Sequence, residues 1–346
     1  MAVTAALPRT APGTQHGVTA PSEATQLLTV EHLKTQFATR NGWLTAVNDV
    51  SFTLSPGTVL GVLGESGSGK SAMLRTILGL QPKSARISGT VTLEGRDLIS
   101  MSTRQRAAIR GSSVSMVFQD PMTALDPVFT VEQQLVETIR RHTDLSKGDA
   151  TERALELLTL VEIPSPERRL KAYPYELSGG MRQRVVIAMA LVSNPSLLLA
   201  DEPTTALDVT VQARVLDLFR ELKGLHGMGI IFVTHDLSVA AAIADEIAVM
   251  YAGRIVEQGA VEEIVRSPKH PYTRGLLEAN VQPGQQDRPA AIRGAPPNLA
   301  NLPPGCAFAP RCDLVEDRCW SAVPEPVTVG GSHFARCLMV AESEAN

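Results

Sequence analysis

Residues 64–71 read GESGSGKS, a glycine-rich segment with one lysine and three serines. The apolar run TVLGVL precedes it and KSAML follows, so we expect a strand before the segment and a helix after it. In this setting glycines let backbone N–H groups surround phosphate oxygens, and the helix N-terminus adds a favourable dipole. Lys70 can then reach the β- and γ-phosphates of a nucleotide, and Ser71 can ligate Mg²⁺. The predicted phosphate-binding residues are Gly64, Glu65, Ser66, Gly67, Ser68, Gly69, Lys70 and Ser71.

Two adjacent carboxylates, Asp201 and Glu202, end the apolar run in LLLADEP. Asp201 suits the coordination shell of Mg²⁺, directly or through water. Glu202 suits the orientation and activation of a water that attacks the γ-phosphate. An isolated Asp-Glu pair at a strand end is more often a solvated turn, so this interpretation depends on the other motifs.

Residues 177–184, LSGGMRQR, form a second candidate anion site. Ser178, Gly179 and Gly180 stand just before the helical run MRQRVVIAMALV, so free N–H groups and a hydroxyl face outward from a helix N-terminus. Simple helix capping is the alternative interpretation. If residues 177–184 bind an anion, the chain has two phosphate-binding segments, which we call its two cradles.

All four cysteines lie near the C-terminus with the spacing C-x5-C-x6-C-x17-C, at Cys306, Cys312, Cys319 and Cys337. Residues 1–25 are rich in Ala, Thr and Pro without the pattern of a signal peptide, so we expect a disordered lead-in and a reducing, cytosolic compartment. Structural disulfides are therefore disfavoured. Four thiolates can hold a [4Fe–4S] cluster or Zn²⁺, although the close cysteine pairs common in zinc sites are missing from the sequence; unliganded thiols are the third alternative.

Composition and charge describe an ordinary globular protein of 346 residues, with 44% apolar and 20% charged residues, and about two domains. The net charge of −4, from 32 basic and 36 acidic residues, predicts no basic surface for nucleic acid. The apolar runs are too short for a membrane span, so we do not expect the chain to cross a bilayer.

The motifs fall on the expected elements of an α/β core. SLLLAD and GIIFVTH are near-continuous apolar runs, typical of strands covered on both faces of a parallel sheet. Helical periodicity, as in TERALELLTLVEI, predicts a helical insertion over about 120–195. The segment VMYAGRIVEQG predicts a hairpin that turns at Ala252 and Gly253, and the Pro- and Gly-rich residues 282–305 predict a linker.

The ordered motif set between residues 27 and 259 resembles the nucleotide-binding subunit of an ATP-binding cassette (ABC) transporter. This resemblance implies a P-loop NTPase fold with a RecA-like core, an antiparallel β subdomain and a helical subdomain, in residues 26–262. A small irregular domain with the four cysteines follows in residues 263–346. The resemblance also implies ATP and Mg²⁺, and a head-to-tail pair of subunits in which each ATP lies between one subunit's P-loop and the other's signature segment.

Further roles follow from the resemblance. Gln119 in MVFQDP is similar to the Q-loop glutamine, which contacts Mg²⁺ and links the reaction centre to the membrane subunits. Asp208 in TTALD resembles the D-loop, and His235 in FVTHD the switch histidine that contacts the γ-phosphate. The expected adenine-stacking aromatic is Phe37, with Trp43 as the alternative. The implied catalytic residues are therefore Gln119, Glu202 and His235, while Met181 stands where the signature most often has Gln.

Within ABC proteins, the segments HPYTRGLL and GAPPNLANLPPGCAFAPRC resemble the D-type ATPase of oligopeptide, dipeptide and nickel importers. This implies ATP-driven peptide import at the cytoplasmic face of the membrane. The implied partners are a second, different ATPase subunit, two transmembrane permeases and an extracytoplasmic solute-binding protein. Related ATPases carry an iron–sulfur cluster in this tail, which favours [4Fe–4S] at the cysteines. Import of nickel or another small solute is the closest alternative, and a non-transport ABC ATPase acting on DNA or ribosomes is a further one.

Overall fold

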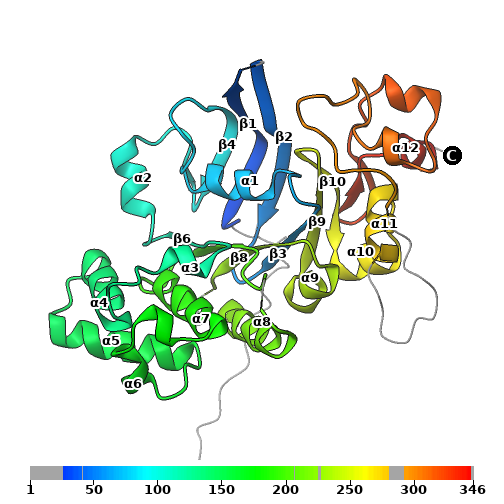
Figure 1. The fold of residues 1–346 in the computed structure, drawn as a ribbon. Coiled ribbons are helices and arrows are strands. Elements are labelled where there is room, and N and C mark those ends of the chain that lie inside the picture. The colour runs from blue at the N-terminus through cyan, green and yellow to red at the C-terminus, as the bar shows by residue number, and fades with distance from the viewer. Residues whose placement is uncertain (1–25, 41, 206, 225–226, 280–291, 344–346) are drawn as a thin grey trace, which may run out of the picture.

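The computed structural model describes residues 26–40, 42–205, 207–224, 227–279 and 292–343 (Figure 1). The expected disordered lead-in, 1–25, lies outside these residues, as does the first part of the expected linker. No helix in the described ranges is both long and apolar enough to span a membrane.

A four-stranded antiparallel sheet forms the upper part of the molecule in Figure 1, in the order β2-β1-β4-β5. Its strands are β1 (Leu28–Thr39), β2 (Gly42–Leu54), β4 (Arg86–Leu93) and β5 (Arg96–Asp97). One face of this sheet is apolar and covers helix α1 (Lys70–Ile77), whose Met73, Leu74 and Ile77 are buried between the two sheets of the protein.

The second sheet has eight strands in the order β11-β12-β10-β9-β3-β8-β7-β6. Strands β6, β7, β8, β3 and β9 run parallel, and β10, β12 and β11 continue the sheet with antiparallel pairing. The bounds are β3 (Val59–Leu63), β6 (Val114–Val117), β7 (Leu197–Asp201), β8 (Gly229–Thr234), β9 (Glu246–Tyr251), β10 (Arg254–Ala260), β11 (Val327–Gly330) and β12 (His333–Ala335). Every residue of β3, β7 and β8 is buried, as their apolar runs predict.

Helices gather below the parallel strands in Figure 1. They include α3 (Pro121–Ala124), α4 (Val131–His142), α5 (Lys147–Leu160), α6 (Pro166–Leu170), η1 (Pro174–Glu176), α7 (Gly179–Ala190) and α8 (Val209–Gly224). Ser146 and Thr130 cap α5 and α4 with their side chains, so each helix begins where its sequence supplies a hydroxyl acceptor. Apolar side chains of α4, α5, α7 and α8 form one core with the sheet. The helical insertion expected over about 120–195 is present in this region.

The remaining helices lie in other parts of the chain. Helix α2 (Thr103–Ile109) follows β5, and α9 (Leu237–Ile243) connects β8 to β9. After β10 come α10 (Val261–Arg266), α11 (Pro271–Ala279), η2 (Ala309–Arg311), η3 (Asp317–Trp320) and α12 (Leu338–Ser343). The hairpin predicted at Ala252 and Gly253 joins β9 to β10.

The C-terminal region shares its sheet and its core with the rest of the chain. Strand β12 pairs with β10, and Tyr272 and Phe308 pack with Tyr251 of β9. The predicted domain boundary at residue 262 stays a prediction, because the sheet continues across it.

Parallel packing explains how the motifs come together. The carboxyl ends of β6, β7, β8 and β3 meet at one end of the sheet, and the segments that follow these strands begin at residues 118, 202, 235 and 64. The fold therefore places four separate motifs side by side.

Candidate functional site

The predicted phosphate-binding loop connects β3 to α1 and closes around its own lysine. Gly69 has a φ of 108°, and a Cβ there would lie 2.3 Å from the carbonyl oxygen of Ala46, so the loop needs glycine at this position. The buried Lys70 donates from Nζ to two carbonyl oxygens of the loop, at 2.7 and 2.9 Å. The hydroxyl of Ser68 is buried without a hydrogen-bond partner in the described part of the chain. A buried ammonium and an unsatisfied hydroxyl fit an incoming polyphosphate, which supplies acceptors for both.

Ser71 and Asp201 lie next to this lysine and contact each other. Ser71 Oγ donates to Asp201 Oδ1 at 2.9 Å, and Asp201 is buried at the end of β7. Burial raises the pKa of Asp201, the Ser71 hydrogen bond opposes the rise, and the charge of Glu202 adds to it. A hydroxyl and a carboxylate are oxygen ligands of the kind that Mg²⁺ prefers, so this pair fits a magnesium site.

Nearby carboxylates offset the effect of burial on the pKa of Lys70. Burial lowers the pKa of Lys70, and the negative charges of Glu202, Asp201 and Glu65 counteract that shift. The surrounding carboxylates therefore favour the charged form of an ammonium that the loop carbonyls hold in place. This electrostatic arrangement keeps a positive charge where phosphates would enter.

Glu202 is the meeting point of three other side chains. Its Oε2 accepts a hydrogen bond from Gln119 Nε2 at 3.2 Å and from Thr205 Oγ1 at 2.9 Å, and lies 3.2 Å from His235 Nδ1. Gln119, Glu202 and His235 follow β6, β7 and β8, so the order of the strands brings these three predicted residues together. A carboxylate fixed in this way can orient a water and accept its proton.

The second cradle begins helix α7. Ser178 Oγ accepts from the backbone N–H of Met181 at 3.3 Å and caps the helix. Gly180 is required by packing, because a Cβ there would lie 2.2 Å from Val211 Cγ1 at the start of α8. Asp208 Oδ1 accepts from the backbone N–H of Val211 at 2.9 Å. The signature segment thus packs against the first turn of α8, to which Asp208 of the D-loop is hydrogen-bonded.

The two cradles of the chain do not face each other. Helix α1 packs against β1, β2 and β7, whereas α7 packs against α3, α5 and α8, and the two helices lie well apart in Figure 1. Ser178 and Gly179 are exposed, and a Cβ added at Gly179 would meet no atom of the described chain within 4 Å. The exposed cradle is therefore accessible to another molecule.

The two candidate aromatics for adenine stacking differ in their surroundings. Trp43 is exposed, but the guanidinium of Arg86 lies 3.7 Å from the centre of its ring. Phe37 lies across the β1–β2 ladder, opposite Leu44, and is half-buried. Arg86 therefore covers one face of the Trp43 ring, and the choice of Phe37 as the adenine-stacking aromatic stays a prediction.

The four cysteines line one small, mainly apolar cavity and are all free thiols. Burial raises the pKa of Cys306 to about 11; the backbone N–H of Phe308 opposes the rise, and the charges of Cys337 and Cys319 add to it. No group of three or more His, Cys, Asp or Glu side chains in the described ranges is arranged to hold a metal ion. The four thiols thus converge on one cavity, but no described group has the arrangement of a metal site, so the predicted [4Fe–4S] cluster and its Zn²⁺ alternative stay predictions.

Three contacts at the site lie beyond the sequence prediction. Thr205 donates to Glu202, and a hydroxyl in TTALD gives no sequence signal for this role. Arg311 and Tyr272 both contact Glu65 in the phosphate-binding loop, although they lie more than 200 residues away. No motif spacing could indicate contacts over that separation.

A phosphate loop after β3, a carboxylate pair after β7, and a capped glycine signature before α7 define an ATP-binding cassette. The family model described as "ABC transporter" matches residues 47–205, and the model described as "Oligopeptide/dipeptide transporter, C-terminal region" matches residues 256–319.

Known proteins and solved structures show the same likeness. The chain is 47% identical over 306 residues to the oligopeptide transport ATP-binding protein OppD of Salmonella typhimurium, covering 88% of this chain and 91% of that protein. It is 44% identical over 317 residues to OppD of Haemophilus influenzae, covering 91% and 98%. A solved dimeric structure of the ATP-binding cassette MJ0796, in a post-hydrolysis state with ADP and Pi, aligns with a TM-score of 0.61 at 28% identity, covering 68% of this chain and 98% of that one. The chain belongs to the ABC transporter ATP-binding proteins, in the oligopeptide/dipeptide transporter family.

Proposed function

We propose that this chain is the ATP-hydrolysing subunit that drives import of di- and oligopeptides through an ABC transporter. The observation that carries the proposal is the convergence of Gln119, Glu202 and His235 beside the Ser71–Asp201 pair. The cargo class is supported by the match of the C-terminal region and by relatives named for oligopeptide transport.

Each predicted residue has a role in this proposal. The loop of residues 64–71 holds the phosphates of ATP, and Phe37 stacks on its base. Ser71, Asp201 and Gln119 would hold Mg²⁺, which neutralises charge on the transferring phosphoryl group when bound. Glu202 orients the attacking water and accepts its proton, and His235 contacts the γ-phosphate.

A second subunit completes the site. The exposed residues Ser178 and Gly179, with Gly180 and Asp208, would face the ATP held by the phosphate loop of a partner subunit. ATP then bridges the two subunits, and loss of the γ-phosphate contacts lets them separate. The solved cassette dimer named above supports this arrangement. We infer that the partner is a different ATPase subunit, so that the pair is a heterodimer.

The proposed assembly contains this heterodimer, two transmembrane permeases and an extracytoplasmic solute-binding protein, with the chain on the cytoplasmic face of the membrane. To test it, the assembly is reconstituted in vesicles and ATP hydrolysis is measured with the binding protein loaded with peptide. Stimulation that disappears in the Glu202→Gln variant is the expected result. Stimulation by nickel chelates but not by peptides would overturn the cargo class, and stimulation by nucleic acid alone would overturn the transport function.

For the cysteines, we propose that the cavity they line takes up a [4Fe–4S] cluster, with Zn²⁺ as the alternative occupant. The support is the convergence of all four thiols on one apolar cavity. Uptake would require the surrounding segments to adjust, because the present arrangement holds no metal-binding group among the described residues. Iron and sulfide analysis of anaerobically purified protein tests this. About four irons and four sulfides per chain is expected, whereas stoichiometric zinc, or no metal, would reject the cluster.

A further inference from the structure

Arg311 crosses from the cysteine-bearing tail to the phosphate-binding loop. Its Nη1 donates to Glu65 Oε2 at 2.7 Å and its Nη2 donates to Glu65 Oε1 at 2.9 Å, a bidentate pair between residues 246 positions apart. The Arg311 side chain is 6% exposed and that of Glu65 is 23% exposed, so solvent screens the pair only weakly. This is a specific link between the tail and the loop.

The remaining donors of Arg311 fix the guanidinium in place. Its Nε donates to the carbonyl oxygen of Arg293 at 2.8 Å, and its Nη1 also lies 3.5 Å from the hydroxyl of Tyr251. The Glu65 hydrogen bonds raise the pKa of Arg311, so the cation is permanent. A rigid, charged fork of this kind holds a carboxylate in one orientation.

The backbone of Glu65 is held by the same region of the chain. Its N–H donates to the hydroxyl of Tyr272 at 3.0 Å, and the Tyr272 ring packs against Tyr251 and Phe308. Both the side chain and the backbone of one loop residue are thus attached to the C-terminal core. The conformation of the loop at this residue depends on that core.

The pairing of Arg311 with Glu65 affects how the loop would bind the phosphates of ATP. Glu65 carries a negative charge in a loop that binds a polyanion, and its charge already acts on Lys70. Without a counterion, this carboxylate would repel the phosphates and would also compete with them for the Lys70 ammonium. Arg311 removes this repulsion.

We propose that Arg311 is a positioning residue for ATP binding, which neutralises Glu65 and fixes the conformation of the phosphate loop at that residue. The proposal rests on the proposed ATPase function. It makes the cysteine-bearing tail part of the ATP site, without contact between the tail and ATP.

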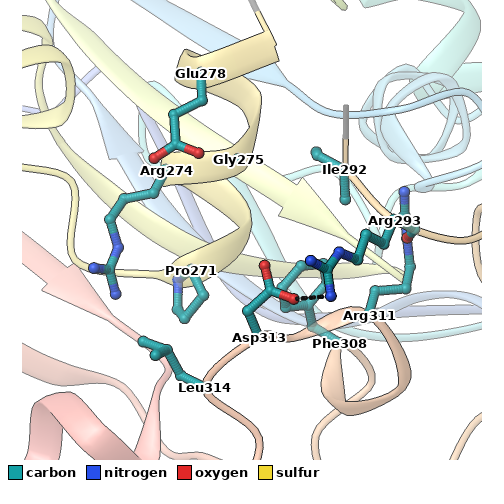
Figure 2. A pocket seen from close by; sticks show the side chains of 10 residues that line it. All are labelled: Pro271, Arg274, Gly275, Glu278, Ile292, Arg293, Phe308, Arg311, Asp313 and Leu314. Atoms are coloured by element: carbon teal, nitrogen blue, oxygen red, sulfur yellow. Dashed lines mark hydrogen bonds and ion pairs between the residues drawn. The ribbon is translucent and has the colours of Figure 1, made fainter. Parts of the chain in front are cut away.

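Arg293 offers a matched control, because it lines the same cavity of about 320 Å³ as Arg311 (Figure 2). The Arg293 side chain is exposed and pairs with Asp313 at 3.2 Å instead of reaching the loop. Arg311→Met and Arg293→Met therefore remove the same charge from the same cavity. ATP affinity of the isolated, full-length subunit is measured by calorimetry. We expect Arg311→Met to weaken ATP binding about tenfold and Arg293→Met to change it less than twofold.

Recovery of ATP affinity by a second substitution distinguishes charge neutralisation by Arg311 from a merely structural role of this residue. Adding Glu65→Gln to Arg311→Met removes the uncompensated carboxylate and is expected to recover most of the ATP affinity. Arg311→Lys keeps the charge but not the bidentate contact, so an intermediate loss is expected; it carries the test if Arg311→Met does not fold. Unchanged affinity in both Arg311 variants, or no recovery with Glu65→Gln, would overturn the proposal. Absence of ATP binding by the wild-type chain would instead overturn the proposed function.

Discussion

Ser71 Oγ and Asp201 Oδ1 are hydrogen-bonded at 2.9 Å, although 130 residues separate them in the chain. The contact joins the first turn of α1 to the end of β7 and brings two oxygen ligands to one point. A divalent ion bound by both oxygens would replace this hydrogen bond, and the serine hydroxyl would keep its proton.

The first prediction concerns this pair. Ser71→Ala removes one oxygen ligand, so the Mg²⁺ concentration for half-maximal ATP hydrolysis should rise about tenfold or more. Ser71→Thr keeps the hydroxyl and should retain the wild-type requirement to within a few-fold. A magnesium titration of ATPase activity measures both, and equal requirements in Ala and wild type would remove Ser71 from the magnesium site.

The second prediction concerns Glu202. Glu202→Gln keeps the size of the side chain and one acceptor oxygen but removes the base, so single-turnover hydrolysis should fall about 10²- to 10⁴-fold. Binding of ATP should be retained, because Lys70 and the loop are unchanged. Undiminished hydrolysis at the site that contains the substitution would contradict the role assigned to Glu202.

The third prediction uses two neighbouring glycines. Gly180→Ala places a methyl group against Val211 and should lower the free energy of unfolding by about 1–3 kcal/mol. Gly179→Ala adds the same methyl where the described chain leaves open space, so stability should be kept. Adding Val211→Ala to Gly180→Ala should restore most of the loss. Urea unfolding of the subunit compares the variants, and equal stabilities of the two single variants would show that the close packing is not maintained.

The fourth prediction concerns pH. His270 is buried, and burial lowers its pKa to about 3 from 6.5, while Nδ1 accepts the backbone N–H of Tyr272 at 3.0 Å. The unfolded chain therefore takes up a proton first as the pH falls below 6.5, and stability present above 6.5 is lost toward pH 3. At pH 5 the loss should be about 2 kcal/mol.

His270→Asn tests this assignment, because its oxygen can accept the same N–H two residues ahead but does not titrate. The variant can be less stable at every pH, yet its stability should change less than that of the wild type between pH 7 and pH 5. Urea unfolding at the two pH values gives this difference. Identical pH dependence would assign the titration to other groups.

Much of the nucleotide site could be predicted from sequence because its parts are local. The P-loop, the Asp201–Glu202 pair and the signature each carry their chemistry within eight residues and next to a strand or helix of clear periodicity. Burial of β7 and β8 and the helical insertion follow from the same patterns. Gln119 and His235 needed the family resemblance, because a lone amide or imidazole has no local signal.

The interactions of the C-terminal region could not be predicted in this way. The bond between Arg311 and Glu65 depends on a packing arrangement that brings two distant segments together, and no periodicity encodes it. Glu257 is similar, because its carboxylate receives the backbone N–H groups of Lys269 and His270 and lies 2.8 Å from His333 Nε2. Read along the chain, Glu257 is only one acidic residue in a short hairpin.

The pairing of β12 with β10 has a practical consequence for shortened forms of the protein. Only two register pairs, Glu257–Ala335 and Gln258–Phe334, cover this side of β10. Removal of the residues after about 325 would leave a bare strand edge, and unpaired N–H and C=O groups of such an edge recruit strands from other molecules. A truncated chain should therefore aggregate unless that edge is protected by charge or proline.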